Sequence, residues 1–206
     1  MSEVKKIISK LKTILGKSLL KDSMWMLSSQ IIGIFIQGAY FIIVARVLGA
    51  GAYGIFIGIA AFVKLLFPFV GCGSSDIFLK YVSRDSKLFR GYWGTTLLTS
   101  SLFVLGLVPI MLGLVKVIFT PDTSLLLVLF ILLADLLGGK IFDLTSKAFV
   151  SFDQFKLNAQ SRILFSIGKL LAAVALLVFF EDGNIVAWGG LYCLGSILPA
   201  TVSLLT

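Results

Sequence analysis

Long apolar runs, separated by short polar segments, make up most of the 206-residue chain. A helix needs about 20 mainly apolar residues to cross a hydrocarbon core of roughly 30 Å. Transmembrane strands would instead give alternating segments of about ten residues, and the chain does not show that alternation. The runs therefore predict an all-α membrane protein, a bundle of six transmembrane helices with spans at about 24–46, 54–72, 93–115, 124–147, 163–180 and 184–206.

A different pattern precedes the first span. Between residues 1 and 22, apolar residues recur every three or four positions with lysines between them, which is the spacing of an amphipathic helix. Its apolar members are Val4, Ile7, Ile8, Leu11, Leu15 and Leu19. We expect residues 1–22 to form an amphipathic interfacial helix, a leader on the cytoplasmic membrane surface, followed by a six-helix lobe at 23–206.

The composition agrees with a membrane chain, because 58% of the residues are hydrophobic and the mean hydropathy is +1.05. The leader and the loops after the second and fourth spans hold thirteen Lys and Arg residues, against two in the opposite loops. This bias predicts a multi-pass protein of the cytoplasmic (plasma) membrane with its N-terminus in the cytoplasm. The net charge of +8 therefore indicates contact with membrane lipids and no nucleic-acid partner.

The chain offers little for covalent chemistry. Cys72 and Cys193 lie in or beside apolar segments, so they predict neither a disulfide framework nor a metal site. The absence of histidine excludes zinc-protease and histidine-based acyl-transfer chemistry, and no Gly-rich phosphate loop is present. We expect no enzyme activity and no cofactor.

Charged residues inside the expected spans are the main candidates for function, because each costs about 2.5 to 3.5 kcal/mol at a span centre. Lys64 and Asp135 each lie ten or eleven residues from the outer end of their spans, so both should sit about 15 Å deep. Asp135, Lys140 and Asp143 share one broad face of the fourth span, and Lys147 extends this face toward the cytoplasm.

Two interpretations fit these charges. They form structural ion pairs, Asp143 with Lys140 or Lys147 and Asp135 with Lys64. Alternatively, they line a water-filled pathway in which the lysines attract an anionic substrate and a carboxylate binds a coupling ion.

Neutral polar residues add to the inward face of the first span. Gln30 and Gln37 share this face with Tyr40, and they either form interhelical hydrogen bonds or contact substrate. Arg46 ends the span, where its guanidinium either snorkels to water or binds a phosphate. The glycines that follow predict a tight reversal, with positive φ at Gly49 and Gly51, and close helix packing on the face formed by Gly54 and Gly58.

The same turn carries a family resemblance. The segment "ARVLGAGAYGIF" at 45–56 matches the pattern R-x-L-G-x-x-x-Y-G, and "GCGSSDIFLKYVSRD", "LFRGYWGT" and "KAFVSFDQFKLNAQSRI" follow it along the chain. In these segments the chain resembles the Wzx-type polysaccharide-transport flippases of the multidrug/oligosaccharidyl-lipid/polysaccharide exporter superfamily. Those exporters have two six-helix lobes around a central cavity, and this chain resembles the N-terminal lobe alone.

The resemblance implies a membrane transporter that flips a lipid-diphosphate-linked oligosaccharide by alternating access, with ion-gradient coupling of the antiporter kind. The substrate-binding residues would then be Arg46, Lys64, Lys140, Gln30 and Gln37, with Asp135 or Asp143 binding a proton or sodium ion. Its partners would be the lipid-linked oligosaccharide, membrane lipids, and a missing C-terminal lobe or a second copy. A multidrug or small-cation exporter of the same superfamily, or a truncated remnant that does not transport, are the alternatives.

Overall fold

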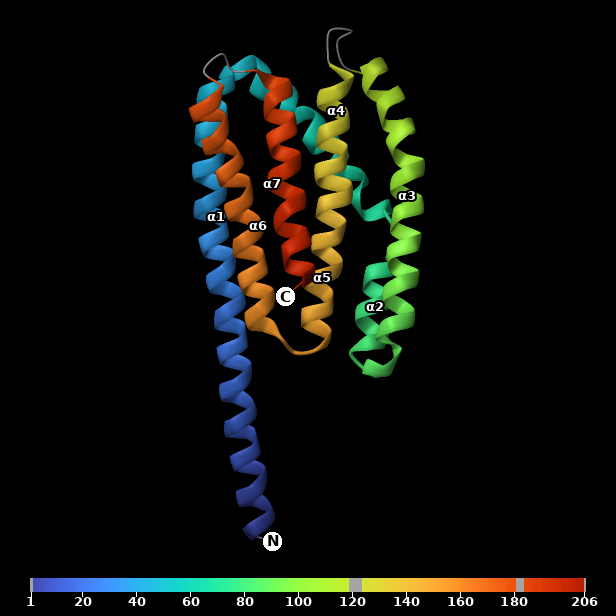
Figure 1. Ribbon diagram of the computed structural model, residues 1–206. Coiled ribbons are helices and arrows are strands. Elements are labelled where there is room, and N and C mark those ends of the chain that lie inside the picture. Colours follow the sequence, from blue (N-terminus) through green and yellow to red (C-terminus); the bar gives the residue numbers. More distant parts are fainter. Residues whose placement is uncertain (1, 119–123, 181–183, 206) are drawn as a thin grey trace.

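The structure is a computed structural model that describes residues 2–118, 124–180 and 184–205, with side chains from residue 22 to 115 and in the two later ranges. Every regular element in these residues is a helix, and the long helices run side by side (Figure 1). Five helical segments of the described chain are long and apolar enough to cross a membrane. The predicted all-α membrane bundle is confirmed.

The first helix, α1 (Ser2–Leu66), contains the first expected span and most of the second. The apolar segment Asp22–Phe69, which extends past the end of α1, has 48 residues, and Gly49 divides it with φ 74° and ψ 166°. The chain rises to this kink, turns over and runs back across the bundle (Figure 1). The predicted reversal is confirmed at Gly49, whereas Gly51 does not adopt the positive φ expected of it. Residues 2–21 continue the same helix, and their side chains lie outside the described set.

The second span ends earlier than expected. A short 3-10 helix, η1 (Phe67–Phe69), follows α1, and Gly71, Cys72 and Gly73 then have φ values of 79°, 44° and 78°. Three successive residues with positive φ cannot continue a right-handed helix. The chain restarts as α2 (Ser74–Val82), turns through η2 (Ser86–Leu88) and continues as α3 (Phe89–Ile118).

The fourth span is one rod with a wider turn in its middle. It consists of α4 (Leu125–Leu132), the π-helix η3 (Leu133–Gly138) and α5 (Gly139–Ser151). The N–H of Gly139 bonds to the carbonyl of Ala134, five residues back, which is the π pattern. The last two spans are α6 (Phe155–Phe179), which begins eight residues before its expected start, and α7 (Ile185–Leu205).

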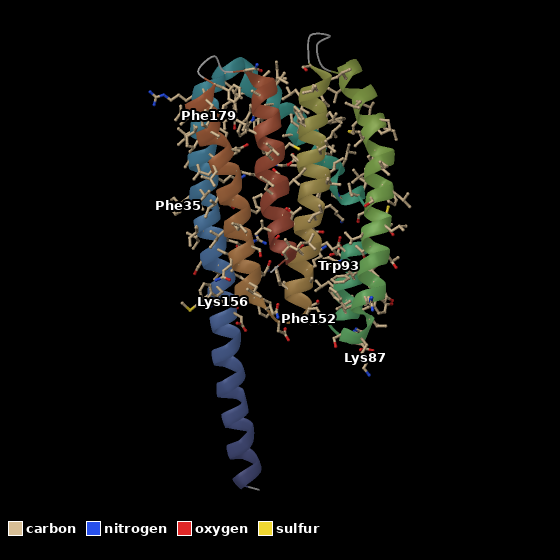
Figure 2. The ribbon with its side chains drawn as sticks, viewed as in Figure 1. Phe35, Lys87, Trp93, Phe152, Lys156 and Phe179 are labelled. Carbon is tan, nitrogen blue, oxygen red and sulfur yellow. The ribbon has the colours of Figure 1, made fainter. Side chains whose placement is uncertain are left out.

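The core of the bundle lies where α1 packs on α6, α6 on α7, and α7 on α4 and η3. Phe56 and Trp188 are fully buried there, with ring centroids 5.5 Å apart. On the outer faces, Phe35 and Phe179 are 75% and 77% exposed and point away from the bundle (Figure 2). Apolar side chains this exposed are suited to contact with lipid chains.

The closest helix packing occurs between α6 and α7. A Cβ added to Gly195 would lie 2.8 Å from the Cβ of Ala172 and from the carbonyl oxygen of Gly168, and one added to Gly168 would collide with Pro199. At Gly54, where close packing was expected, no atom lies within 4 Å of an added Cβ. That expectation was wrong, because Gly54 lies on an exposed face of α1.

The turns before α3 and before α6 lie at one end of the bundle, together with Lys87 and Lys156 (Figure 2). We call this end, defined by residues 80–90 and 152–156, the basic end, because it holds five Lys and Arg residues against two Asp residues. The N-terminal part of α1 extends beyond the same end (Figure 1). Loops that the sequence places on one side of the membrane thus lie together.

Candidate functional site

Three polar side chains from three helices meet inside the bundle. Tyr192 on α7 donates a hydrogen bond from its hydroxyl to Oδ1 of Asp135, at 2.6 Å. Lys169 on α6 donates from Nζ to the same hydroxyl oxygen at 3.1 Å, and its Nζ lies 3.9 Å from Oδ1 of Asp135. Asp135 is 7% exposed and belongs to η3, so the π-helical turn carries the acidic member of this network. We call these three residues the Asp135 network.

A cavity of about 160 Å³ adjoins the network. Both halves of α1 contribute to its lining, together with α6 and α7, and the lining residues are Gln37, Tyr40, Lys64, Phe165, Ser166, Lys169 and Tyr192. Among the described residues, this lining includes two lysines and no carboxylate, because Asp135 lies behind Tyr192. We call it the cationic cavity.

The cavity opens at the surface of the bundle, where the side chains of Gln37 and Lys64 are exposed. Ionisable residues within membrane helices almost always face a bundle interior or a water-filled space. The face with Gln37 and Lys64 is therefore suited to water or to another protein surface. Phe35, two positions before Gln37, points away from the bundle, toward the side where lipid chains can contact it (Figure 2).

A second set of charges links α5 to α2. Asp143 lies 3.6 Å from Lys140 and 3.5 Å from Lys147, and Lys147 reaches Asp76 on α2 at 2.7 Å. We call Asp76, Lys140, Asp143 and Lys147 the ion-pair chain. Its two acidic and two basic residues balance in formal charge. The ion pairs that the sequence suggested for Asp143 are present, in agreement with the interpretation that these charges form structural ion pairs.

The predicted site residues separate into three groups. Gln37 and Lys64 line the cationic cavity, and Asp135 lies directly behind it. Lys140 and Asp143 belong to the ion-pair chain instead.

The remaining two predicted residues, Arg46 and Gln30, are exposed on α1 and do not line the cavity. Gln30 lies seven residues before Gln37, which is about 10.5 Å along the helix. The expected partner of Asp135 also differs, because its ion pair within the described residues is with Lys169, and not with Lys64.

Lys169 and Tyr192 are the members that sequence analysis missed. Lys169 is the single charged residue between residues 163 and 180, so its position inside an apolar run was a usable signal. Tyr192 gives no comparable signal, since a tyrosine in an apolar helix is ordinary. Its role depends on the way that α7 packs against η3 and α6.

A comparison with protein families identifies the family of this chain of apolar helices around a polar site. The family model of polysaccharide biosynthesis proteins matches residues 19–206. The chain belongs to this family. Searches of the curated proteins and of the solved structures gave no match. The matched range includes all the spans and the whole cationic cavity, so this member of the family is a multi-pass membrane protein with its polar site inside the family region.

Proposed function

We propose that the protein is a flippase of the Wzx type, which moves a lipid-diphosphate-linked oligosaccharide from the inner to the outer leaflet of the cytoplasmic membrane. Transport proceeds by alternating access, is coupled to an ion gradient, and needs no covalent step. The N-terminus and the basic end face the cytoplasm. Membership of a polysaccharide biosynthesis family supports the substrate class.

The cationic cavity is the observation that carries this proposal. Lys64 and Lys169 share a space of about 160 Å³, and none of the described residues that line it is a carboxylate. Two ammonium groups repel each other, and an anion placed between them removes that repulsion and gains charge-assisted hydrogen bonds. The diphosphate of a lipid-linked oligosaccharide is such an anion, and its lipid anchor keeps it within the membrane.

Glycan contacts would come from the polar groups beside the lysines. Gln37 offers an amide donor and acceptor, and Ser166 and Tyr40 offer hydroxyls. A flippase must also accept a large head group, and the open side of the cavity provides access for it. We propose that a second six-helix lobe, or a second copy of this chain, faces the open side and completes a central cavity.

Asp135 is the leading candidate for binding the coupling ion. It lies one hydroxyl group away from the cavity, behind Tyr192. Asp143 ranks second, because two lysines already accompany its carboxylate. Arg46, Gln30 and Lys140 lie outside the lining of the cationic cavity.

A small-cation or multidrug exporter is the second candidate, and Asp135 is the observation in its favour. A buried carboxylate can bind a cationic compound. The cavity itself presents two lysines, however, and a cation would have to pass both of them to reach Asp135. Electrostatics therefore favour the anionic substrate.

Deletion of the gene in the native cell, followed by complementation, tests the proposed function. Cells without the protein should accumulate lipid-linked oligosaccharide in the inner leaflet, and the wild-type gene should restore its export. The double variant Lys64→Ala/Lys169→Ala, compared with the wild type at equal amounts of membrane-inserted protein, should fail to restore export. Lys87→Ala is the matched control, because Lys87 is exposed at the basic end.

Normal glycan export by the inserted double variant would contradict the role of the cavity. Loss of resistance to cationic dyes in the deleted cells, with normal glycan export, would favour the exporter of small cations. Absence of both effects would indicate a chain that does not transport.

A further inference from the structure

We propose that Asp135 is the counter-ion of the empty cationic cavity: an anionic ligand displaces it from Lys169, and the displaced carboxylate then takes up a proton. The inference rests on the proposed function, because the ligand is the anion bound in the same cavity. The coupling ion is then a proton, and binding of the ligand favours binding of the proton.

The two oxygens of Asp135 have different surroundings. Oδ1 accepts the hydrogen bond of Tyr192 at 2.6 Å and lies 3.9 Å from Nζ of Lys169. Oδ2 is buried and has no hydrogen-bond partner among the described residues. A buried carboxylate oxygen without a donor is costly, so the ionised form depends on the nearby ammonium of Lys169. Oδ2 is also the oxygen that is free to bind a proton.

Lys169 belongs to both the network and the cavity. Its Nζ donates to Tyr192, and it also lies over the rings of Phe165 and Tyr192, at 4.9 and 4.7 Å from their centroids. An ammonium group has three donors, and its side chain lines the cavity where the ligand binds. A diphosphate carries more charge than Asp135, so it competes for the same ammonium and draws it toward the cavity.

When Lys169 is drawn away from Asp135, a proton is the positive charge that can take its place, given the groups that surround Asp135. Tyr192 faces it from α7 and Lys169 from α6, while α1 contributes Tyr40 and Lys64 on the cavity side. Helix α4 has no titratable residue, and α3 meets η3 through Ser100, Ser101 and Val104 around a small cavity.

On α5, Lys140 pairs with Asp143. Lys64 lies in the cavity, where the ligand engages it together with Lys169. A proton from water therefore bonds to Oδ2 when the ligand enters, and it returns to water when the ligand leaves.

This exchange keeps the site close to neutral in both states of a transport cycle. The empty site holds the Asp135–Lys169 pair, and the loaded site holds the anion with the lysines and a neutral carboxyl. Burying an uncompensated charge is costly, so both states can reorient at lower cost than a cationic site without Asp135. Anion and proton then bind and leave together, which differs from the ion exchange that the family resemblance implies, so the inside-negative membrane potential, acting on the net negative charge of the cargo, drives export in this proposal.

Calorimetric titration of the purified full chain with inorganic pyrophosphate tests the inference. Titrations near neutral pH in two buffers of different ionisation enthalpy give the number of protons taken up per pyrophosphate. The wild type should take up about one proton more than Asp135→Asn. Protonation of pyrophosphate itself is the same for both proteins and cancels. The variant should also bind pyrophosphate roughly tenfold more tightly above neutral pH, because a competing unit charge is removed.

Asp153→Asn is the matched control, because Asp153 is exposed in the turn before α6 and the change removes the same charge. It should keep the proton count and affinity of the wild type. Equal proton counts in the wild type and Asp135→Asn, with binding intact, would overturn the inference and leave the anion site standing. No pyrophosphate binding by the wild type would overturn both.

A second measurement needs no variant. Infrared difference spectra of the wild type should show the carbonyl band of a newly protonated carboxyl group when pyrophosphate binds, and heavy water should shift it. Pyrophosphate binding without that band would overturn the inference even if Asp135→Asn fails to fold.

Discussion

The ion pair between Lys169 and Asp135 should be stronger in free energy than the shorter pair between Lys147 and Asp76. The first pair is 3.9 Å apart, with side chains 20% and 7% exposed, whereas the second is 2.7 Å apart and Asp76 is 75% exposed. At an effective dielectric constant of about 20, two charges 3.9 Å apart attract each other by about 4 kcal/mol. Exposed pairs contribute about 1 kcal/mol or less, because water screens them.

Double-mutant cycles measure these energies. Lys169→Met should lower the free energy of unfolding by about 3 to 5 kcal/mol, because it leaves Asp135 buried without its ammonium. Adding Asp135→Leu should recover much of this loss and give a coupling energy of about 2 to 4 kcal/mol. The cycle of Lys147→Met with Asp76→Leu should give about 1 kcal/mol or less.

Unfolding in mixed micelles with increasing denaturing detergent provides the assay, and tryptophan fluorescence follows it. Trp188 is a suitable reporter because it is fully buried and its ring centroid lies 5.7 Å from that of Tyr192. A larger coupling energy for the shorter, exposed pair would refute the reasoning. It would mean that distance, and not burial, sets the strength of ion pairs in this bundle.

Two further predictions concern glycines. Gly168→Ala should lower the free energy of unfolding by about 1 to 3 kcal/mol in the same assay, because the new methyl group collides with Pro199, whereas Gly54→Ala meets open space and should have little effect. Gly49→Ala should cost about 1 to 3 kcal/mol because its φ of 74° and ψ of 166° are accessible almost only to glycine, and Gly51→Ala should be close to neutral; equal effects of the two changes would contradict the kink at Gly49.

The sequence predicts the bundle well, because span length and apolar content follow directly from the thickness of a bilayer. It also places Gln37 on a polar face of the first span and Asp135 at the depth of Lys64, and the structure brings these three to one region. Depth along a helix depends on a fixed rise per residue, so counting residues is enough to find it.

Counting residues along the sequence does not show which helices lie next to one another in the bundle. Two spans at equal depth pair their charges only if they are adjacent and suitably rotated, and Lys169 on α6 takes the position beside Asp135 that was assigned to Lys64. The π turn also rotates the residues after Asp135 relative to a regular helix, and Lys140 and Asp143 belong to the ion-pair chain that reaches α2 through Lys147 rather than to the cavity lining. These relations depend on the packing of several helices together.

Water access to the cationic cavity is the central claim, and cysteine labelling in intact membranes tests it most directly. Ser166→Cys, in the cavity lining, should react with an anionic, membrane-impermeant thiol reagent, and pyrophosphate should slow the reaction. Leu171→Cys, on the same helix, should stay unreactive although Leu171 is 62% exposed, because lipid covers it. The wild type, with Cys72 and Cys193, gives the background. Unreactive Ser166→Cys, or equal labelling with and without pyrophosphate, would contradict an anion-binding cavity in this protein.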